Sequence, residues 1–67
     1  MDLATKTVLH TLVHTIVSRT DPGTAKAIVE NLFVAGEDLR NENFHAEARA
    51  VESVAEAALV AQDNRSA

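Results

Sequence analysis

The chain has no cysteine, tryptophan or tyrosine, and only two phenylalanines among its 67 residues. Without cysteine it can form neither a disulfide bond nor a thiolate metal site, two common means of stabilising small domains. A chain of this length buries only about 60% of the surface that it exposes when unfolded. Although 46% of its residues are hydrophobic, a core of this size is marginal by itself. Very regular helix packing or oligomerisation must therefore supply the stability.

Long apolar runs are also absent. No stretch of about 18 apolar residues could cross a membrane, and His10 and His14 interrupt the apolar segment near the N-terminus, which argues against a signal peptide. With no tryptophan and few cations, an amphipathic membrane anchor is not expected. These absences predict a soluble, cytoplasmic protein that does not contact a membrane.

Basic residues are few and scattered. Six lysines and arginines stand against ten acids, which gives a formal net charge of −4. Binding to nucleic acid needs a basic stripe or patch, because the release of phosphate counterions supplies most of the affinity. Nucleic-acid binding is therefore disfavoured, and it stays an alternative only because a symmetric dimer can concentrate scattered charges on one face.

Residues 7–18 contain a four-residue repeat: Thr-Val-Leu-His, Thr-Leu-Val-His and Thr-Ile-Val-Ser. Read as a strand, this segment mixes polar and aliphatic side chains on both faces. Read as a helix, it places its main aliphatic side chains within about 100° of each other: Leu9, Leu12, Val13 and Ile16. The repeat therefore predicts a helix over residues 3–19. Because threonine and valine are weak helix formers, this helix must depend on packing.

The clearest break in the sequence is at residues 20–24. Asp21 can cap a helix with its carboxylate while Pro22 occupies the first helical position, where its missing N–H costs nothing. A second helix is predicted over residues 22–39, with an apolar stripe at alternating spacings of three and four: Ala25, Ile28, Leu32, Ala35 and Leu39. The short connection favours an antiparallel helical hairpin.

The second helix has a wider apolar sector than one partner helix needs. Val29 and Phe33 lie beside the main stripe, and Phe33 points about 140° away from Ile28. Gly36 is interpreted as a close-packing site or as a weak point of this helix. A helix-turn-helix is not indicated, because Leu32 stands where a small residue is preferred and no basic cluster flanks the following helix.

A third apolar stripe begins at Phe44 and is rotated by more than about 100° from the second. Its members are Phe44, Ala48, Val51, Ala55 and Ala58. We predict a break after residue 39, with Asn41 or Asn43 capping a third helix over residues 43–61 and Glu47 in its first turn. One long second helix that turns its apolar face is the alternative. Residues 62–67 have no periodicity and are expected to fray.

Candidate chemical groups are sparse. His10 and His14 are four residues apart, a spacing that lets two imidazoles bind one metal ion, but no third ligand is evident. A phosphoryl group on one of these histidines or on His45 would need a docking surface that the sequence does not indicate. Among the serines, only Ser53 has possible partners within helical reach. We therefore expect no enzymatic activity, no cofactor and no metal ion.

These features predict an all-α fold, in which residues 1–67 form one domain: a small three-helix bundle made of a helical hairpin and a third helix. Its apolar surface exceeds what one bundle can bury, so we expect dimerisation into a larger helical bundle through four interaction residues: Val29, Phe33, Phe44 and Val51. The leading hypothesis is a non-enzymatic regulatory module that forms a homodimer and binds another protein through apolar helix faces. The alternatives are nucleic-acid binding through a symmetric patch and a histidine-based metal or phosphotransfer site. The sequence does not identify a small-molecule ligand.

Overall fold

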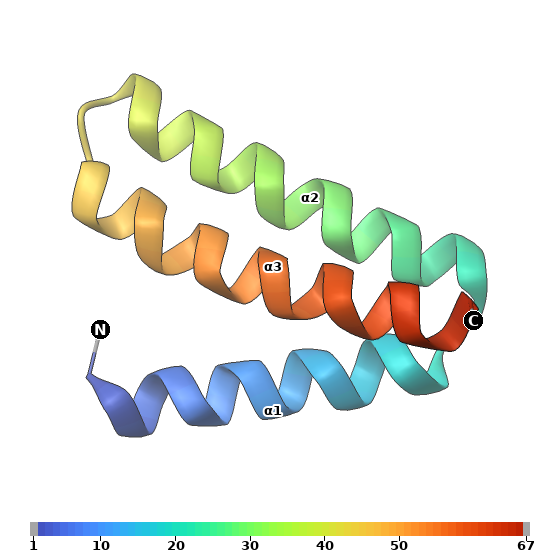
Figure 1. Cartoon of the computed structure of the whole chain (residues 1–67). Helices are drawn as coiled ribbons and strands as arrows, with labels where there is room; N and C mark the ends of the chain where they lie inside the picture. Colours follow the sequence, from blue (N-terminus) through green and yellow to red (C-terminus); the bar gives the residue numbers. More distant parts are fainter. Residues whose placement is uncertain (1, 67) are drawn as a thin grey trace.

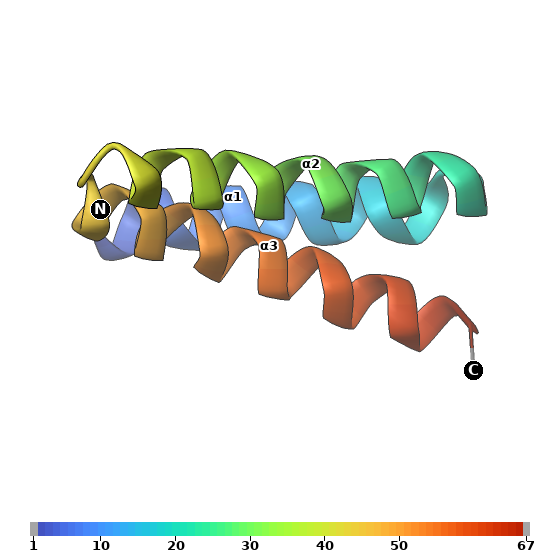
Figure 2. The same cartoon turned by 90° about the horizontal axis from the view of Figure 1, so that it is seen from above.

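The computed structural model describes residues 2–66, the last of them by its backbone, and contains three helices: α1 (Leu3–Arg19), α2 (Pro22–Asn41) and α3 (His45–Ser66). The predicted all-α, three-helix fold is confirmed. Figure 1 shows that α3 lies between α1 and α2, which are close at their connecting turn and diverge toward their other ends. Seen from above in Figure 2, α1 and α2 overlie one another and α3 moves away from both toward its C-terminal end. Within the described residues, no helix has the length and apolar character needed to cross a membrane.

Aspartates cap the first two helices. The Asp2 carboxylate accepts a hydrogen bond from the Thr5 backbone N–H at 2.7 Å, and the Asp21 carboxylate accepts from the backbone N–H and the hydroxyl of Thr24 at 2.9 and 2.6 Å. Pro22 follows Asp21 at the start of α2. The predicted cap at Asp21 is confirmed, and Asp2 does the same for α1.

A break separates α2 from α3 as the sequence predicts, but α2 ends at residue 41 instead of 39 and α3 begins at residue 45 instead of 43. The asparagines of the break also act differently. Asn43 has a φ of 69°, in the left-handed region. Its N–H donates to the Arg40 carbonyl at 3.0 Å, and the N–H of Phe44 donates to the Leu39 carbonyl at 2.9 Å. This pair of bonds is the Schellman motif, which ends a helix. Asn43 therefore closes α2, Asn41 is its last residue, and the prediction that either asparagine caps α3 is wrong.

The last turns of α3 are hydrogen-bonded to the end of α1. Nη1 of Arg65 donates to the backbone carbonyl of Val17 at 2.9 Å and also to that of Thr20. Carbonyls at a helix C-terminus lack partners within their own helix, so Arg65 satisfies the end of α1 while it holds α3. α3 extends to Ser66, beyond the predicted end of the third helix at residue 61, and residue 67 lies outside the described residues.

Small residues form the contact between α2 and α3. A Cβ added to Gly36 would lie 2.9 Å from Glu52 Cγ and 3.6 Å from the Ala48 carbonyl oxygen, so the two helices approach closely at this glycine. Of the two interpretations of Gly36, the close-packing site is confirmed. Among the residues that the structure describes, the buried hydrophobic ones are mostly alanines: Val17, Ala25, Val29, Ala48, Val54, Ala55, Ala58 and Ala61.

α1 joins the core through few residues. Val17 is its only buried residue among those described, and Val13 packs partly buried against the same core cluster. Leu12 and Ile16, which belong to the predicted apolar stripe, remain exposed. The stripe is therefore split lengthwise, because α1 turns its Val13–Val17 edge toward α3 and diverges from α2, which could have covered the rest.

Candidate interaction surfaces

Four exposed aliphatic side chains lie on one side of α1. We name these residues the α1 apolar face: Val8, Leu9, Leu12 and Ile16. They are 38–56% exposed and lie within about 100° of each other around the helix, with a centre about 130° from Val17. A surface helix ordinarily turns such a stripe toward a core. Here the stripe faces solvent.

The α1 apolar face has the spacing of a helix-pairing seam. Leu9, Leu12 and Ile16 follow one another at intervals of three and four residues, as the core positions of a coiled coil do. Thr5 extends this row toward the N-terminus and Arg19 toward the C-terminus. The face can therefore accept one further helix along most of the length of α1.

The four predicted interaction residues are not together on one exposed patch. Val29 is only 6% exposed and belongs to the core cluster, against which Phe33 also packs. Val51 is half-buried on α3, and Phe44 is 49% exposed in the turn before it. Dimerisation through these residues stays a prediction. The spacing of the α1 apolar face was visible in the sequence, but it indicated a core stripe.

A second surface lies between α1 and α3 and consists of two neighbouring shallow clefts. The histidine cleft, of about 340 Å³, is lined by His10, Thr11, His14, Thr15 and Ala57. The cationic cleft, of about 240 Å³, is lined by Lys6, Ala46, Arg49, Ala50 and Ser53. The two clefts adjoin because His10 of the first is hydrogen-bonded to Ser53 of the second.

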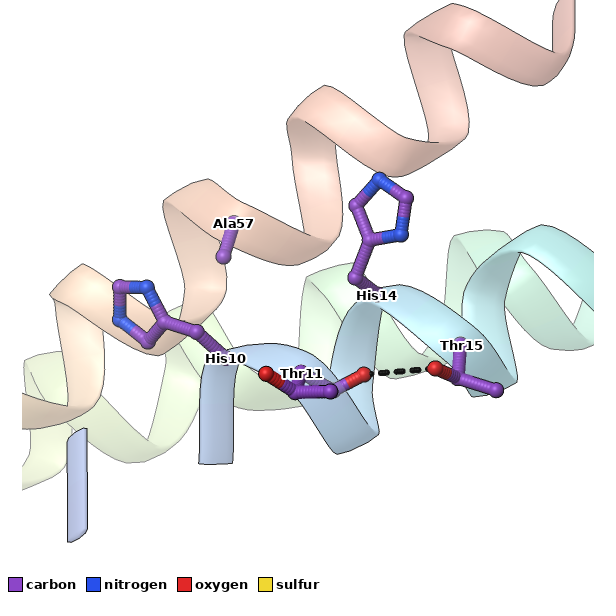
Figure 3. Close-up of a pocket in the computed structure, with 5 residues that line it drawn as sticks. All are labelled: His10, Thr11, His14, Thr15 and Ala57. Carbon is purple, nitrogen blue, oxygen red and sulfur yellow. Dashed lines mark hydrogen bonds between the residues drawn. The ribbon is translucent and has the colours of Figure 1, made fainter. Parts of the chain in front are cut away.

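Both histidines of α1 have hydroxyl partners. His10 Nε2 is 3.1 Å from Ser53 Oγ in a partly buried bond between α1 and α3, and His14 Nδ1 is 3.5 Å from Ser18 Oγ. Figure 3 shows both rings projecting from α1 toward α3, one on each side of Ala57. Among residues 2–65, no three histidine, aspartate or glutamate side chains are grouped as a metal site requires.

The partner of Ser53 could not be identified from the sequence, where only its neighbours within α3 were considered. A serine beside a histidine resembles the first two members of a nucleophilic site. In this pair, however, no side chain among residues 2–65 hydrogen-bonds to the second ring nitrogen of His10. Both residues also lie inside helices, where backbone N–H groups are already bonded and cannot stabilise an oxyanion. The pair joins two helices.

The cations of the chain fall into two groups. Three have partners within the described protein, either carboxylates or backbone carbonyls: Lys26, Arg40 and Arg65. The side chains of Lys6, Arg19 and Arg49 make no hydrogen bond or ion pair with residues 2–65. Lys6 and Arg49 line the same cleft, whereas Arg19 stands at the end of the seam row on α1.

Comparison with known proteins assigns no function to either surface. The chain matches no protein family model, no curated protein and no solved structure.

Proposed function

We propose that the chain is a non-enzymatic, cytoplasmic regulatory module that forms a homodimer through the α1 apolar face and binds another protein in that form. The observation that supports it is the exposure of this face on a helix with a single buried residue. Each square ångström of apolar surface removed from water contributes about 25 cal/mol. Contiguous exposed apolar patches on small proteins commonly mark interaction sites. A partner helix on this face completes the burial that α2 does not provide.

The α1 apolar face is complementary to a second copy of itself. In the dimer, two α1 helices pack antiparallel, and the twofold axis crosses them at the level between positions 10 and 11. This arrangement brings three pairs of positions opposite each other: Leu9 and Leu12, Thr5 and Ile16, Asp2 and Arg19. The last pair matches an acid with an arginine that has no side-chain partner among residues 2–65. A parallel pair would instead set Asp2 against Asp2 and Arg19 against Arg19. Charge therefore favours the antiparallel dimer.

The dimer is tested by two matched substitutions, Leu12→Glu and Val34→Glu. These side chains are 53% and 54% exposed, but Val34 is on α2, away from the α1 apolar face. An unpaired carboxylate in the interface costs several kcal/mol, so Leu12→Glu should weaken association about a hundredfold or more. We expect light scattering to give a dimer for the unmodified chain and for Val34→Glu, and a helical monomer for Leu12→Glu. A folded monomer of the unmodified chain at micromolar concentration would refute the proposal.

The direction of pairing can be measured because the sequence has no cysteine. In the antiparallel dimer, a cysteine at position 9 of one copy lies opposite position 12 of the other. A mixture of Leu9→Cys and Leu12→Cys chains should therefore form mixed disulfide-linked dimers faster than either variant links to itself. Faster self-linking of each variant would indicate a parallel pair.

A further inference from the structure

We propose that the cationic cleft between α1 and α3 binds the phosphate group of a small phosphate monoester. Lys6 comes from α1, Arg49 and Ser53 come from α3, and two alanines complete the lining. Around α1, Lys6 lies about 110° from the centre of the α1 apolar face. This site is therefore separate from the proposed dimer contact, and neither proposal depends on the other.

The charge distribution of the cleft favours an anion. Lys6 and Arg49 have no ion-pair or hydrogen-bond partner among residues 2–65, and no acidic residue lines either of the two clefts. The chain as a whole carries ten acids against six basic residues, so a cleft lined by two cations and by no acid is unusual for this chain. Like charges on neighbouring helices repel each other, and a bound anion replaces this repulsion with attraction.

The donor groups of the cleft suit a phosphate. A guanidinium presents a planar fork of N–H donors and an ammonium presents a point charge, and both bind phosphate oxygens through charge-assisted hydrogen bonds. When Nε2 of His10 carries the proton and donates to Ser53 Oγ, the serine keeps its hydroxyl hydrogen for a further bond. Two cations and a hydroxyl match a dianion with three free oxygens better than they match a carboxylate, which carries one charge.

The size of the clefts sets the size of the ligand. A volume of about 240 Å³ is below the roughly 300–1,000 Å³ of pockets that hold drug-sized molecules, so the cationic cleft suits a small group such as a phosphate. The histidine cleft beside it has room for a short organic group over Ala57, between the rings shown in Figure 3. A net charge of −4 opposes the approach of a polyanion such as nucleic acid.

The test is an NMR titration of the isotope-labelled chain with inorganic phosphate and with phenyl phosphate at constant ionic strength. We expect saturable shifts centred on residues 6, 10, 49 and 53, and tighter binding of phenyl phosphate because its ring can occupy the histidine cleft. Lys6→Ala and Arg49→Ala should each weaken phenyl phosphate binding about tenfold, as the loss of a charge-assisted hydrogen bond implies. Lys26→Ala removes the same charge from α2 and should leave the affinity unchanged.

Several outcomes would overturn the proposal. Shifts that do not saturate, or an equal loss of affinity in Lys26→Ala and Lys6→Ala, would show a general attraction of anions only. Tighter binding of an RNA duplex than of phenyl phosphate at the same salt concentration would exclude a small ligand. The three alanine variants change exposed helix positions, and circular dichroism checks that they fold. The monomeric Leu12→Glu chain should bind phenyl phosphate like the unmodified chain, so failure of the dimer would leave this result standing.

Discussion

α2 and α3 approach closely where glycine and alanine lie between them, whereas α1 presents branched aliphatic side chains to solvent. Between α2 and α3, Gly36 allows an approach so close that a single added Cβ would lie 2.9 Å from Glu52. On α1, Leu12 and Ile16 are about half exposed although they are larger than the alanines and valines that are buried in the core. Small residues let two helix backbones pack closely, and this contact is complete within one chain. The large aliphatic side chains of the α1 apolar face can be buried only against the surface of a partner.

The two regions also differ in what holds them. α2 and α3 share the buried alanines and the ion pair between Arg40 and Glu52. α1 depends on Val17 and on two polar connections to α3, one through His10 and Ser53 and one through Arg65. Because threonine and valine give α1 little intrinsic helicity, we expect it to open at a lower free energy than the α2–α3 pair.

The largest expected effect comes from breaking the α2–α3 contact. Gly36→Leu places a side chain where Glu52 and the Ala48 carbonyl already lie, and such overpacking should lower the free energy of unfolding by about 3 kcal/mol. Urea denaturation measures this loss. Asn31→Leu adds the same side chain at an exposed position of α2 and should change stability by less than about 0.5 kcal/mol. Equal free energies of unfolding for Gly36→Leu and Asn31→Leu would show that the close approach at Gly36 does not stabilise the fold.

The second effect tests the attachment of α1. Val17→Ala removes methyl groups from the largest fully buried side chain and should cost about 2 kcal/mol, as cavities in small cores do. Hydrogen exchange should show the amides of α1 losing protection before those of α2 and α3. Both Val17→Ala and its control Val8→Ala are made in the monomeric Leu12→Glu chain, where no dimer contact protects α1, and Val8→Ala should have little effect because Val8 is exposed. Uniform loss of protection in all three helices would contradict the weaker attachment of α1.

A smaller effect is expected for the connection between the ends of α1 and α3. Arg65→Ala removes the guanidinium bonds to the carbonyls of Val17 and Thr20 and should cost about 1 kcal/mol, since these bonds are partly exposed to water. Amide exchange at residues 62–66 should rise in the same variant. Arg49→Ala, which removes an arginine without such bonds, is the control, and an equal loss in both would argue against the connection.

The smallest effect is a change in acid sensitivity. The side-chain and backbone hydrogen bonds from Thr24 hold the pKa of the Asp21 carboxyl below its ordinary value. A lowered folded-state pKa contributes stability above the unfolded-state pKa of about 4, and this stability is lost as the pH falls through the folded-state value. Asp21→Asn still caps α2 but cannot titrate, so its melting temperature should fall less below pH 4. If the melting temperatures of both proteins fall equally below pH 4, the Asp21 carboxyl does not contribute to acid sensitivity.

The parts of the fold that could be predicted from sequence depend on neighbours in the chain. Asp21 caps α2 three residues before its partner Thr24, and the out-of-phase stripes show where α2 must end. The parts that could not be predicted join distant residues. His10 and Ser53 are 43 residues apart, and Arg65 and Thr20 are 45 apart. Sequence periodicity does not predict contacts between residues so far apart. It also does not predict which edge of the α1 stripe faces the core, because the orientation of α1 depends on where α3 lies.

The position of α3 between α1 and α2 (Figure 1) has a consequence for synthesis. The ribosome produces α1 and α2 first, yet the element that both of them pack against is the last of the three. The backbone carbonyls of Val17 and Thr20 at the end of α1 accept hydrogen bonds from Arg65, which is synthesised after most of α3. Domains fold as units during synthesis, and the nascent chain here has no complete unit until α3 has emerged. We therefore expect the first two helices to stay without the packing that α3 provides until α3 has emerged from the ribosome.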